Sequence, residues 1–156
     1  MTEFTHINAQ GEAHMVDVSN REVTERASTA RGLVALKPET VSAIRDARLP
    51  KGDVLATARI AGIQAAKRTA ELIPLCHPIS ISFADVALAL TEAGVEISAE
   101  VRINDRTGVE MEALTAVSVA GLTIIDMVKS ADPGAMLTNV RVVEKSGGRS
   151  GTWTNA

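Results

Sequence analysis

Cysteine and aromatic residues are scarce in this chain of 156 residues. A single cysteine, Cys76, excludes an intramolecular disulfide framework and a zinc site built from paired cysteines. With two phenylalanines, one tryptophan and no tyrosine, the chain lacks the aromatic platforms on which single-stranded nucleic acids usually stack. A net charge of −3 gives no overall bias toward polyanions. We therefore expect a protein that binds no nucleic acid and holds no metal site.

Long uninterrupted hydrophobic runs are also missing. The longest apolar stretch, residues 113–128, is interrupted by Thr115, Ser118, Thr123 and Asp126, so we expect no membrane span. The first eleven residues have neither a basic start nor an apolar run, and we expect no signal peptide. The simplest expectation is a cytoplasmic protein.

The remaining composition is that of a globular protein, with 46% hydrophobic and 22% charged residues. We expect a flexible N-terminal arm over residues 1–12, a single α+β domain over 13–145, and a mobile Gly/Ser-rich tail over 146–156. The mixture of strands and helices lacks strict βαβ alternation. It favours a ferredoxin-like antiparallel sheet packed against helices.

Periodicity and turn residues predict the individual elements. We expect strands over residues 14–18, 23–36, 79–83, 95–101 and 140–143, with 79–83 and 95–101 forming an antiparallel pair. We expect a short helix over 38–49, a long alanine-rich helix from an Asp53 N-cap to residue 72, and a second long helix over 112–131. Gly62 gives the first long helix a smooth surface for close packing, either within the chain or against another subunit.

The second long helix carries the most informative pattern. Glu112, Thr115, Ser118, Asp126 and Lys129 fall within one third of its circumference, and the other faces are apolar. A helix this apolar is expected to be buried on most sides, and a buried Asp126 needs a partner. Lys129 is three residues away, within reach. The pair is either an ordinary salt bridge at a helix end or part of a functional site.

Three further groups have both a structural and a functional interpretation. If that segment is extended, Glu110 and Glu112 lie on one face. They are then either paired catalytic carboxylates or solvated charges. His77 lies in a turn fixed by Pro74 and Pro78, which suits a ligand-binding or a structural histidine. Basic residues gather at Lys51, at Lys67–Arg68 and in the glycine-containing segment 145–151. They form either a phosphate-binding site or, in the last segment, a solvated tail.

Six segments together resemble the MoaC family of molybdenum cofactor biosynthesis: His14–Ser19, Lys51–Thr69, Leu72–Pro78, Thr107–Ala116, Asp126–Lys129 and Lys145–Gly148. The resemblance extends from about His6 to Gly151. It implies a ferredoxin-like lyase that forms a hexamer, a trimer of dimers, with active sites at subunit interfaces. The implied reaction converts the 3′,8-cyclo-dihydro-GTP intermediate into cyclic pyranopterin monophosphate and releases pyrophosphate.

The resemblance also implies roles for individual residues. Asp126 and Lys129 match the family's catalytic aspartate and lysine. The matching substrate-binding residues are Leu75, Cys76, His77, Met111 and Glu112, and further pocket positions are Lys51, Glu110, Lys67, Arg26 and Lys145. No tightly bound cofactor is implied, although Mg²⁺ can accompany the triphosphate.

Two other classes of protein remain open from the residues alone. A regulatory or carrier module would bind a nucleoside triphosphate through the same basic residues without converting it. It would not need Asp126 and Lys129 together on an apolar helix. A purely structural oligomer subunit would explain that helix but would leave Glu110, Glu112 and His77 without a role.

Overall fold

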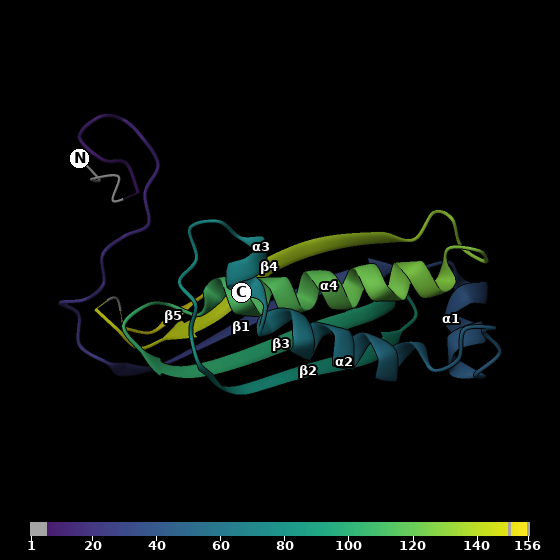
Figure 1. The fold of residues 1–156 in the computed structure, drawn as a ribbon. Helices are drawn as coiled ribbons and strands as arrows, with labels where there is room; N and C mark the ends of the chain where they lie inside the picture. Colours follow the sequence, from purple (N-terminus) through teal and green to yellow (C-terminus); the bar gives the residue numbers. More distant parts are fainter. Residues whose placement is uncertain (1–5, 150, 156) are drawn as a thin grey trace.

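The chain folds around an antiparallel sheet of five strands in the order β2-β3-β1-β4-β5. The structure is a computed structural model that describes residues 6–149 and 151–155. Its strands are β1 (Thr24–Ala35), β2 (Ile81–Thr91), β3 (Gly94–Asp105), β4 (Met136–Ser146) and β5 (Trp153–Thr154). Figure 1 shows the long strands lying together with the helices on one side of them.

Two long helices cover one face of the sheet. Along the chain, α2 (Val54–Ala66) follows β1 and precedes β2, and α4 (Glu110–Val128) follows β3 and precedes β4. The short helices α1 (Pro38–Arg45) and α3 (Thr69–Leu72) precede and follow α2. The chain order β-α-β-β-α-β, with β1 and β3 in the centre, is that of a ferredoxin-like sandwich. The predicted α+β class is therefore confirmed.

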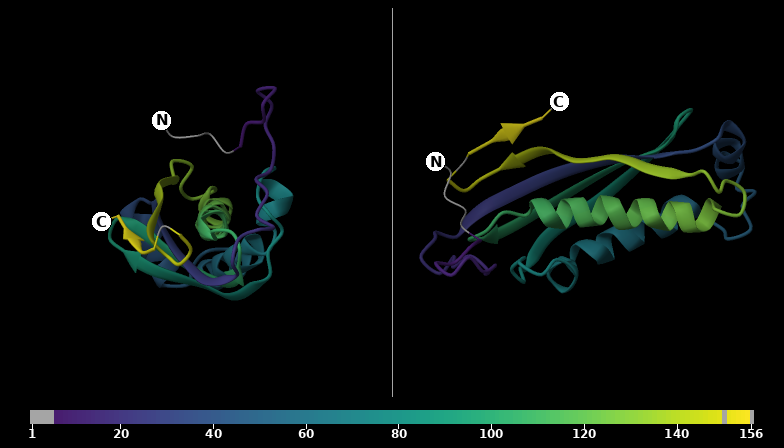
Figure 2. Two further views of the ribbon diagram at one scale, coloured as in Figure 1. Left: turned by 90° about the vertical axis from the view of Figure 1, so that its left-hand side faces the viewer. Right: turned by 90° about the horizontal axis from the view of Figure 1, so that it is seen from above.

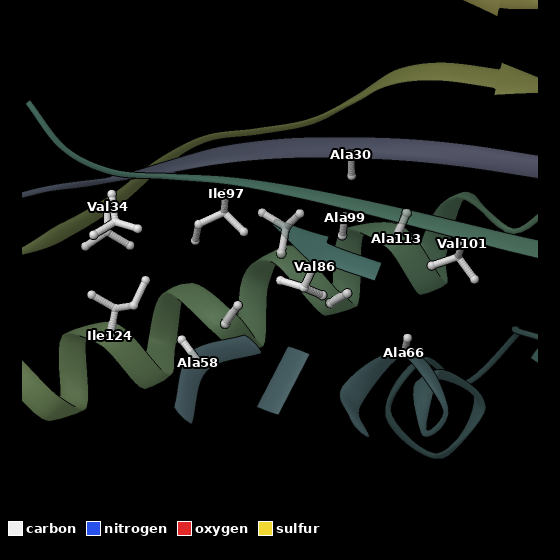
Figure 3. Packing of buried hydrophobic residues seen from close by; sticks show 14 of the residues in the cluster. Ala30, Val34, Ala58, Ala66, Val86, Ile97, Ala99, Val101, Ala113 and Ile124 are labelled. Carbon is white, nitrogen blue, oxygen red and sulfur yellow. The ribbon is translucent and has the colours of Figure 1, made fainter. Parts of the chain in front are cut away.

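The core lies between the sheet and the two long helices. Alternate residues of the central strands point toward the helices, so Val34 and Ile97 are fully buried on the side of α4 that carries Ile124. Val101 lies near Ala113, farther toward the amino end of α4 (Figure 3). Because the chain has so few aromatic residues, small aliphatic side chains fill this space. The end-on view in Figure 2 shows the sheet curving around α4.

The close-packing surface predicted around Gly62 lies within the chain. A Cβ atom at Gly62 would stand 2.9 Å from the Ala116 carbonyl oxygen and 3.3 Å from the Ala120 Cβ. The absent side chain lets α2 lie directly against α4. This contact fixes the position of α4, which carries most of the candidate site.

Two local predictions are wrong. Residues 14–18 form no strand, because the segment leaves the sheet as part of an extended, exposed N-terminal arm (residues 6–23; Figure 1). The first long helix does not continue to residue 72 but ends at Ala66. There the Thr69 hydroxyl donates a hydrogen bond of 3.0 Å to the Ala66 carbonyl oxygen, and the chain turns before α3 begins.

The hairpin prediction is confirmed, with longer strands than expected. β2 and β3 pair antiparallel from Ile81↔Ile103 to Thr91↔Gly94. Gly94 has φ +136°, and a Cβ there would collide with the Val34 carbonyl oxygen, so this turn requires glycine.

Asp53 caps α2 as predicted, since its side chain accepts a 2.9 Å hydrogen bond from the Ala56 N–H. In the tail, Trp153 pairs with Lys145 of β4.

By length and composition alone, α4 is apolar enough to cross a membrane. In this fold 56% of its most apolar 18-residue window is buried. The helix packs against α2 and against the central strands of the sheet. It is the core helix of the sandwich.

Candidate functional site

The two ends of α4 carry separate groups of the predicted site residues. At its carboxyl end lies the C-terminal cluster, which consists of Lys51, Asp126 and Lys129. At its amino end lies the N-terminal cluster, which consists of Leu75, Cys76, His77, Glu110, Met111 and Glu112. α4 supplies residues to both, so the geometry of the site depends on this helix.

The C-terminal cluster is a carboxylate held between two ammonium groups. Asp126 Oδ1 lies 2.7 Å from Lys129 Nζ, and Asp126 Oδ2 lies 2.9 Å from Lys51 Nζ. Lys51 Nζ also donates a 2.9 Å hydrogen bond to the Asp126 backbone carbonyl. The residue pairing predicted from spacing is thus present, and Lys51 is its third member.

The expected burial of Asp126 is wrong, because its side chain is 57% exposed. Asp126 lies in the last turn of α4 and is exposed in the part of the chain that the structure describes. Hydrogen bonds and charge from Lys129 and Lys51 lower the pKa of the Asp126 carboxyl to about 2. Asp126 is therefore ionised at neutral pH and suited to orient the two ammonium groups.

The N-terminal cluster lines a hollow of about 340 Å³. His6, Val16, Val18 and Arg21 of the N-terminal arm line the same hollow. His77 is held in place by a 2.8 Å hydrogen bond between its Nε2 and the Val16 carbonyl oxygen. The arm thus completes one wall of the hollow, a role that its sequence did not indicate.

Glu112 is the most perturbed carboxyl group of the N-terminal cluster. It is 3% exposed, and burial together with the nearby charge of Glu110 raises its pKa to about 7. Burial and Glu112 also raise the pKa of the Cys76 thiol. A carboxyl group with a pKa near neutrality can both donate and accept a proton under physiological conditions. Glu112 is therefore the strongest acid–base candidate in the hollow.

Glu110 and Glu112 do not share a face, contrary to the extended-chain prediction. α4 begins at Glu110, and residues two apart on a helix point in different directions. Glu110 Oε1 lies 3.0 Å from Lys145 Nζ, whereas Glu112 lines a hollow that His77 also lines. Glu110 therefore forms an ion pair, whereas burial is the main influence on the pKa of Glu112.

The predicted basic residues Arg26 and Lys145 border a neighbouring hollow of about 280 Å³. The Arg26 Nε donates a 3.0 Å hydrogen bond to the Asp105 carbonyl oxygen, and its guanidinium lies against Gly148, where a side chain would collide with it. Arg21 and Arg149 line this hollow as well. Arg21 was not predicted from the sequence. Arg149, in contrast, lies in the basic, glycine-containing segment 145–151 that the sequence analysis identified.

Lys67, the remaining predicted residue, lies at the end of α2. It borders a third hollow, of about 260 Å³, which is also lined by His77 and Glu112. Lys67 therefore belongs with the N-terminal cluster and not with Lys51. Among residues 6–149 and 151–155, no group of three or more histidine, cysteine, aspartate or glutamate side chains is arranged to hold a metal ion.

The clusters are too far apart to act on one small molecule within one chain. Asp126 follows Glu112 by fourteen positions along α4, which at a helical rise of about 1.5 Å per residue places them about 21 Å apart. The three hollows lined by Glu110 or Glu112 lie near the amino end of α4. The structure thus brings together most predicted residues, but as two groups.

A family model described as the MoaC family matches residues 15–148, the span that contains both clusters. The chain belongs to the MoaC family. The predicted resemblance is therefore confirmed.

Curated relatives match this MoaC family chain over almost its full length. A protein named cyclic pyranopterin monophosphate synthase from Streptomyces coelicolor is 58% identical over 98% of the chain and 90% of the relative. A protein of the same name from Thermomicrobium roseum is 54% identical over 98% of the chain and 93% of the relative. Cyclic pyranopterin monophosphate synthase 2 from Mycobacterium tuberculosis is 53% identical over 97% of the chain and 91% of the relative.

Proposed function

We propose that this protein is a cyclic pyranopterin monophosphate synthase, a lyase of molybdenum cofactor biosynthesis. Its substrate is (8S)-3′,8-cyclo-7,8-dihydroguanosine 5′-triphosphate, which it converts to cyclic pyranopterin monophosphate with release of pyrophosphate. The observation that carries this proposal is the similarity to enzymes of that name over nearly the whole chain. The arrangement of acid–base and basic groups supports it.

The proposed reaction needs proton transfers, because a guanine-derived ring is opened and a new ring is closed. Glu112, with a pKa of about 7, suits such a transfer at neutral pH. Lys129 serves as a general acid, and Asp126 orients it through their 2.7 Å contact. The low pKa of Asp126 keeps its carboxylate ionised at neutral pH, the form that binds the Lys129 ammonium.

The reaction also needs positive charge, because the triphosphate is attacked at its α-phosphorus and pyrophosphate leaves. Arg26, Lys145 and Lys67 border the hollows beside Glu112 and suit the phosphate groups. Fixed cations of this kind stabilise charge that develops on the leaving group. Mg²⁺ accompanies the triphosphate as part of the substrate, and we propose no tightly bound cofactor. Metal analysis of the purified protein checks this.

We further propose that two copies of the chain build each site, which overcomes the 21 Å separation. The outward face of α4 carries Met111 and Leu122, which are 37% and 59% exposed. The Ser118 hydroxyl between them donates a 2.8 Å hydrogen bond to the Leu114 carbonyl oxygen, so this face has few groups that need water. An exposed apolar stripe of this kind suits burial against another subunit.

A twofold axis near Ser118 would bring the two clusters together. Glu110 and Asp126 lie eight residues to either side of Ser118, so two antiparallel α4 helices place Asp126 of one copy beside Glu110 of the other. Each dimer then holds two complete sites. Three such dimers make the proposed cytoplasmic hexamer, whose mass sedimentation equilibrium measures directly.

The proposed activity is tested by incubating the protein with the cyclic triphosphate and measuring pyrophosphate and pterin product. Formation of both in equal amounts supports the lyase. Binding of the triphosphate without either product would instead support a carrier or regulatory module. The K129A variant tests the acid: unchanged product formation in a single turnover would remove Lys129 from that role.

A further inference from the structure

Asp132 is a buried carboxylate outside both clusters. It is 1% exposed, although Ala131 and Pro133 on either side of it are exposed. Its Oδ2 accepts a 2.8 Å hydrogen bond from the Lys37 N–H. Its Oδ1 is buried and has no hydrogen-bond partner in the part of the chain that the structure describes. Burial of a carboxylate with a single hydrogen bond is costly, so its position calls for an explanation.

On one side, Asp132 is tied to the last turns of α4. Its own N–H donates a 2.8 Å hydrogen bond to the Val128 carbonyl oxygen. The Lys129 N–H donates at 2.9 Å to the Ile125 carbonyl oxygen, so the backbone is hydrogen-bonded from Ile125 to Asp132. Asp126 and Lys129 lie on this segment. The anchoring of Asp132 therefore restrains the backbone of both residues.

On the other side, Asp132 holds the start of α1. Lys37 is the N-cap residue of α1 and forms no side-chain cap, and its carbonyl oxygen accepts from Thr40 and Val41 at 3.0 and 3.1 Å. A carboxylate at this position also interacts favourably with the helix dipole. α1 leads directly into the loop that carries Lys51. The Asp132–Lys37 hydrogen bond thus joins the two segments whose side chains meet in the C-terminal cluster.

We propose that Asp132 is a positioning residue, which clamps the end of α4 to the start of α1 so that Lys51, Asp126 and Lys129 keep their mutual contacts. The catalytic consequence rests on the proposed lyase function. The structural consequence, an intact triad of ion pairs, does not.

Two substitutions remove the clamp from opposite sides. D132A removes the carboxylate, and K37P removes the N–H donor together with the lysine side chain. Lys37 has φ −68° and ψ 150°, a conformation that proline adopts without strain. Two variants serve as matched controls. D132N keeps an oxygen that accepts from Lys37, and K37A keeps the N–H while removing the same side chain as K37P.

The first readout is the acetylation rate of individual lysines with limiting acetic anhydride, measured by mass spectrometry. We expect Lys51 and Lys129 to react several-fold faster in D132A and K37P, because lysines released from Asp126 are more accessible. Lys145, paired with Glu110 near the other end of α4, is the internal control and should keep its rate. D132N and K37A should behave as the unsubstituted protein.

The second readout is pyrophosphate release. We expect kcat to fall about tenfold in D132A and K37P with KM within about twofold, because small misplacement of catalytic groups is costly. If the unsubstituted protein releases no pyrophosphate, the proposed function fails while lysine acetylation still decides the role of Asp132. Unchanged acetylation of Lys51 and Lys129 in folded D132A and K37P overturns the inference. An equal rise at Lys145 also overturns it, since Asp132 would then stabilise the whole fold.

Discussion

Replacing Glu112 with glutamine should remove a pH dependence of stability that this buried carboxyl imposes. In the folded protein its pKa is about 7, against an ordinary value of 4.5. Between these values the unfolded chain releases the proton that the folded chain keeps, so the unfolded state is favoured as pH rises. The contribution of Glu112 to the free energy of unfolding is therefore fully present below about pH 4.5 and is lost as pH rises through 7.

The size of the effect follows from the shift in pKa. Each pKa unit corresponds to about 1.4 kcal/mol in the free energy of unfolding, so the full shift is worth about 3 kcal/mol. Contact of Glu112 with water in the hollow reduces this contribution to about 2 kcal/mol. Glu112→Gln stays neutral at every pH. Its free energy of unfolding relative to the unsubstituted protein should therefore rise by about 2 kcal/mol from pH 5 to pH 8.

Urea denaturation followed by circular dichroism, at one fixed protein concentration, measures this difference. Glu39, exposed on α1, gives the matched control E39Q, which should follow the pH dependence of the unsubstituted protein. A flat difference between E112Q and the unsubstituted protein from pH 5 to pH 8 would show that Glu112 is solvated. In that case the proton-transfer role proposed for it loses its physical basis.

Three further substitutions test the packing and the charge of the molecule. G62A should destabilise the fold by about 1–2 kcal/mol despite the better helix propensity of alanine, because its Cβ would stand 2.9 Å from the Ala116 carbonyl oxygen; thermal melting that shows stabilisation would contradict this contact. K51A and K67A should each weaken substrate binding, and more strongly at low salt, where screening is weak. Unchanged affinity by calorimetry at low ionic strength would remove the substituted lysine from the phosphate site.

The fold could be predicted largely from local patterns. Strict alternation marks the inward residues of β2 and β3, and Asp53 marks the start of α2, because both signals depend on nearby residues. The end of α2 could not be predicted in this way, since it depends on where the Thr69 hydroxyl finds the Ala66 carbonyl oxygen. The position of the N-terminal arm likewise depends on a long-range contact, the hydrogen bond between Val16 and His77, which are sixty-one residues apart in sequence.

The candidate site was predictable residue by residue but not in its arrangement. Spacing identified Asp126 and Lys129 as a pair, because three residues span less than one helical turn. Spacing could not show that Lys51 joins them, since that contact bridges seventy-five positions. The exposure of Asp126 was mispredicted because an apolar helix gives no sign of which face its own chain leaves uncovered.

In the proposed dimer, each site of this lyase combines the C-terminal cluster of one subunit with the N-terminal cluster of another. Mixing the D126A and H77A variants after unfolding, and refolding them together, tests it most directly. Each variant alone should be inactive, whereas mixed oligomers should regain part of the pyrophosphate release, because some sites receive two intact halves. The pair D126A and K51A should show no recovery, since both residues belong to one cluster. Absence of recovery for D126A with H77A, despite verified subunit exchange, would show that each site is built within one chain.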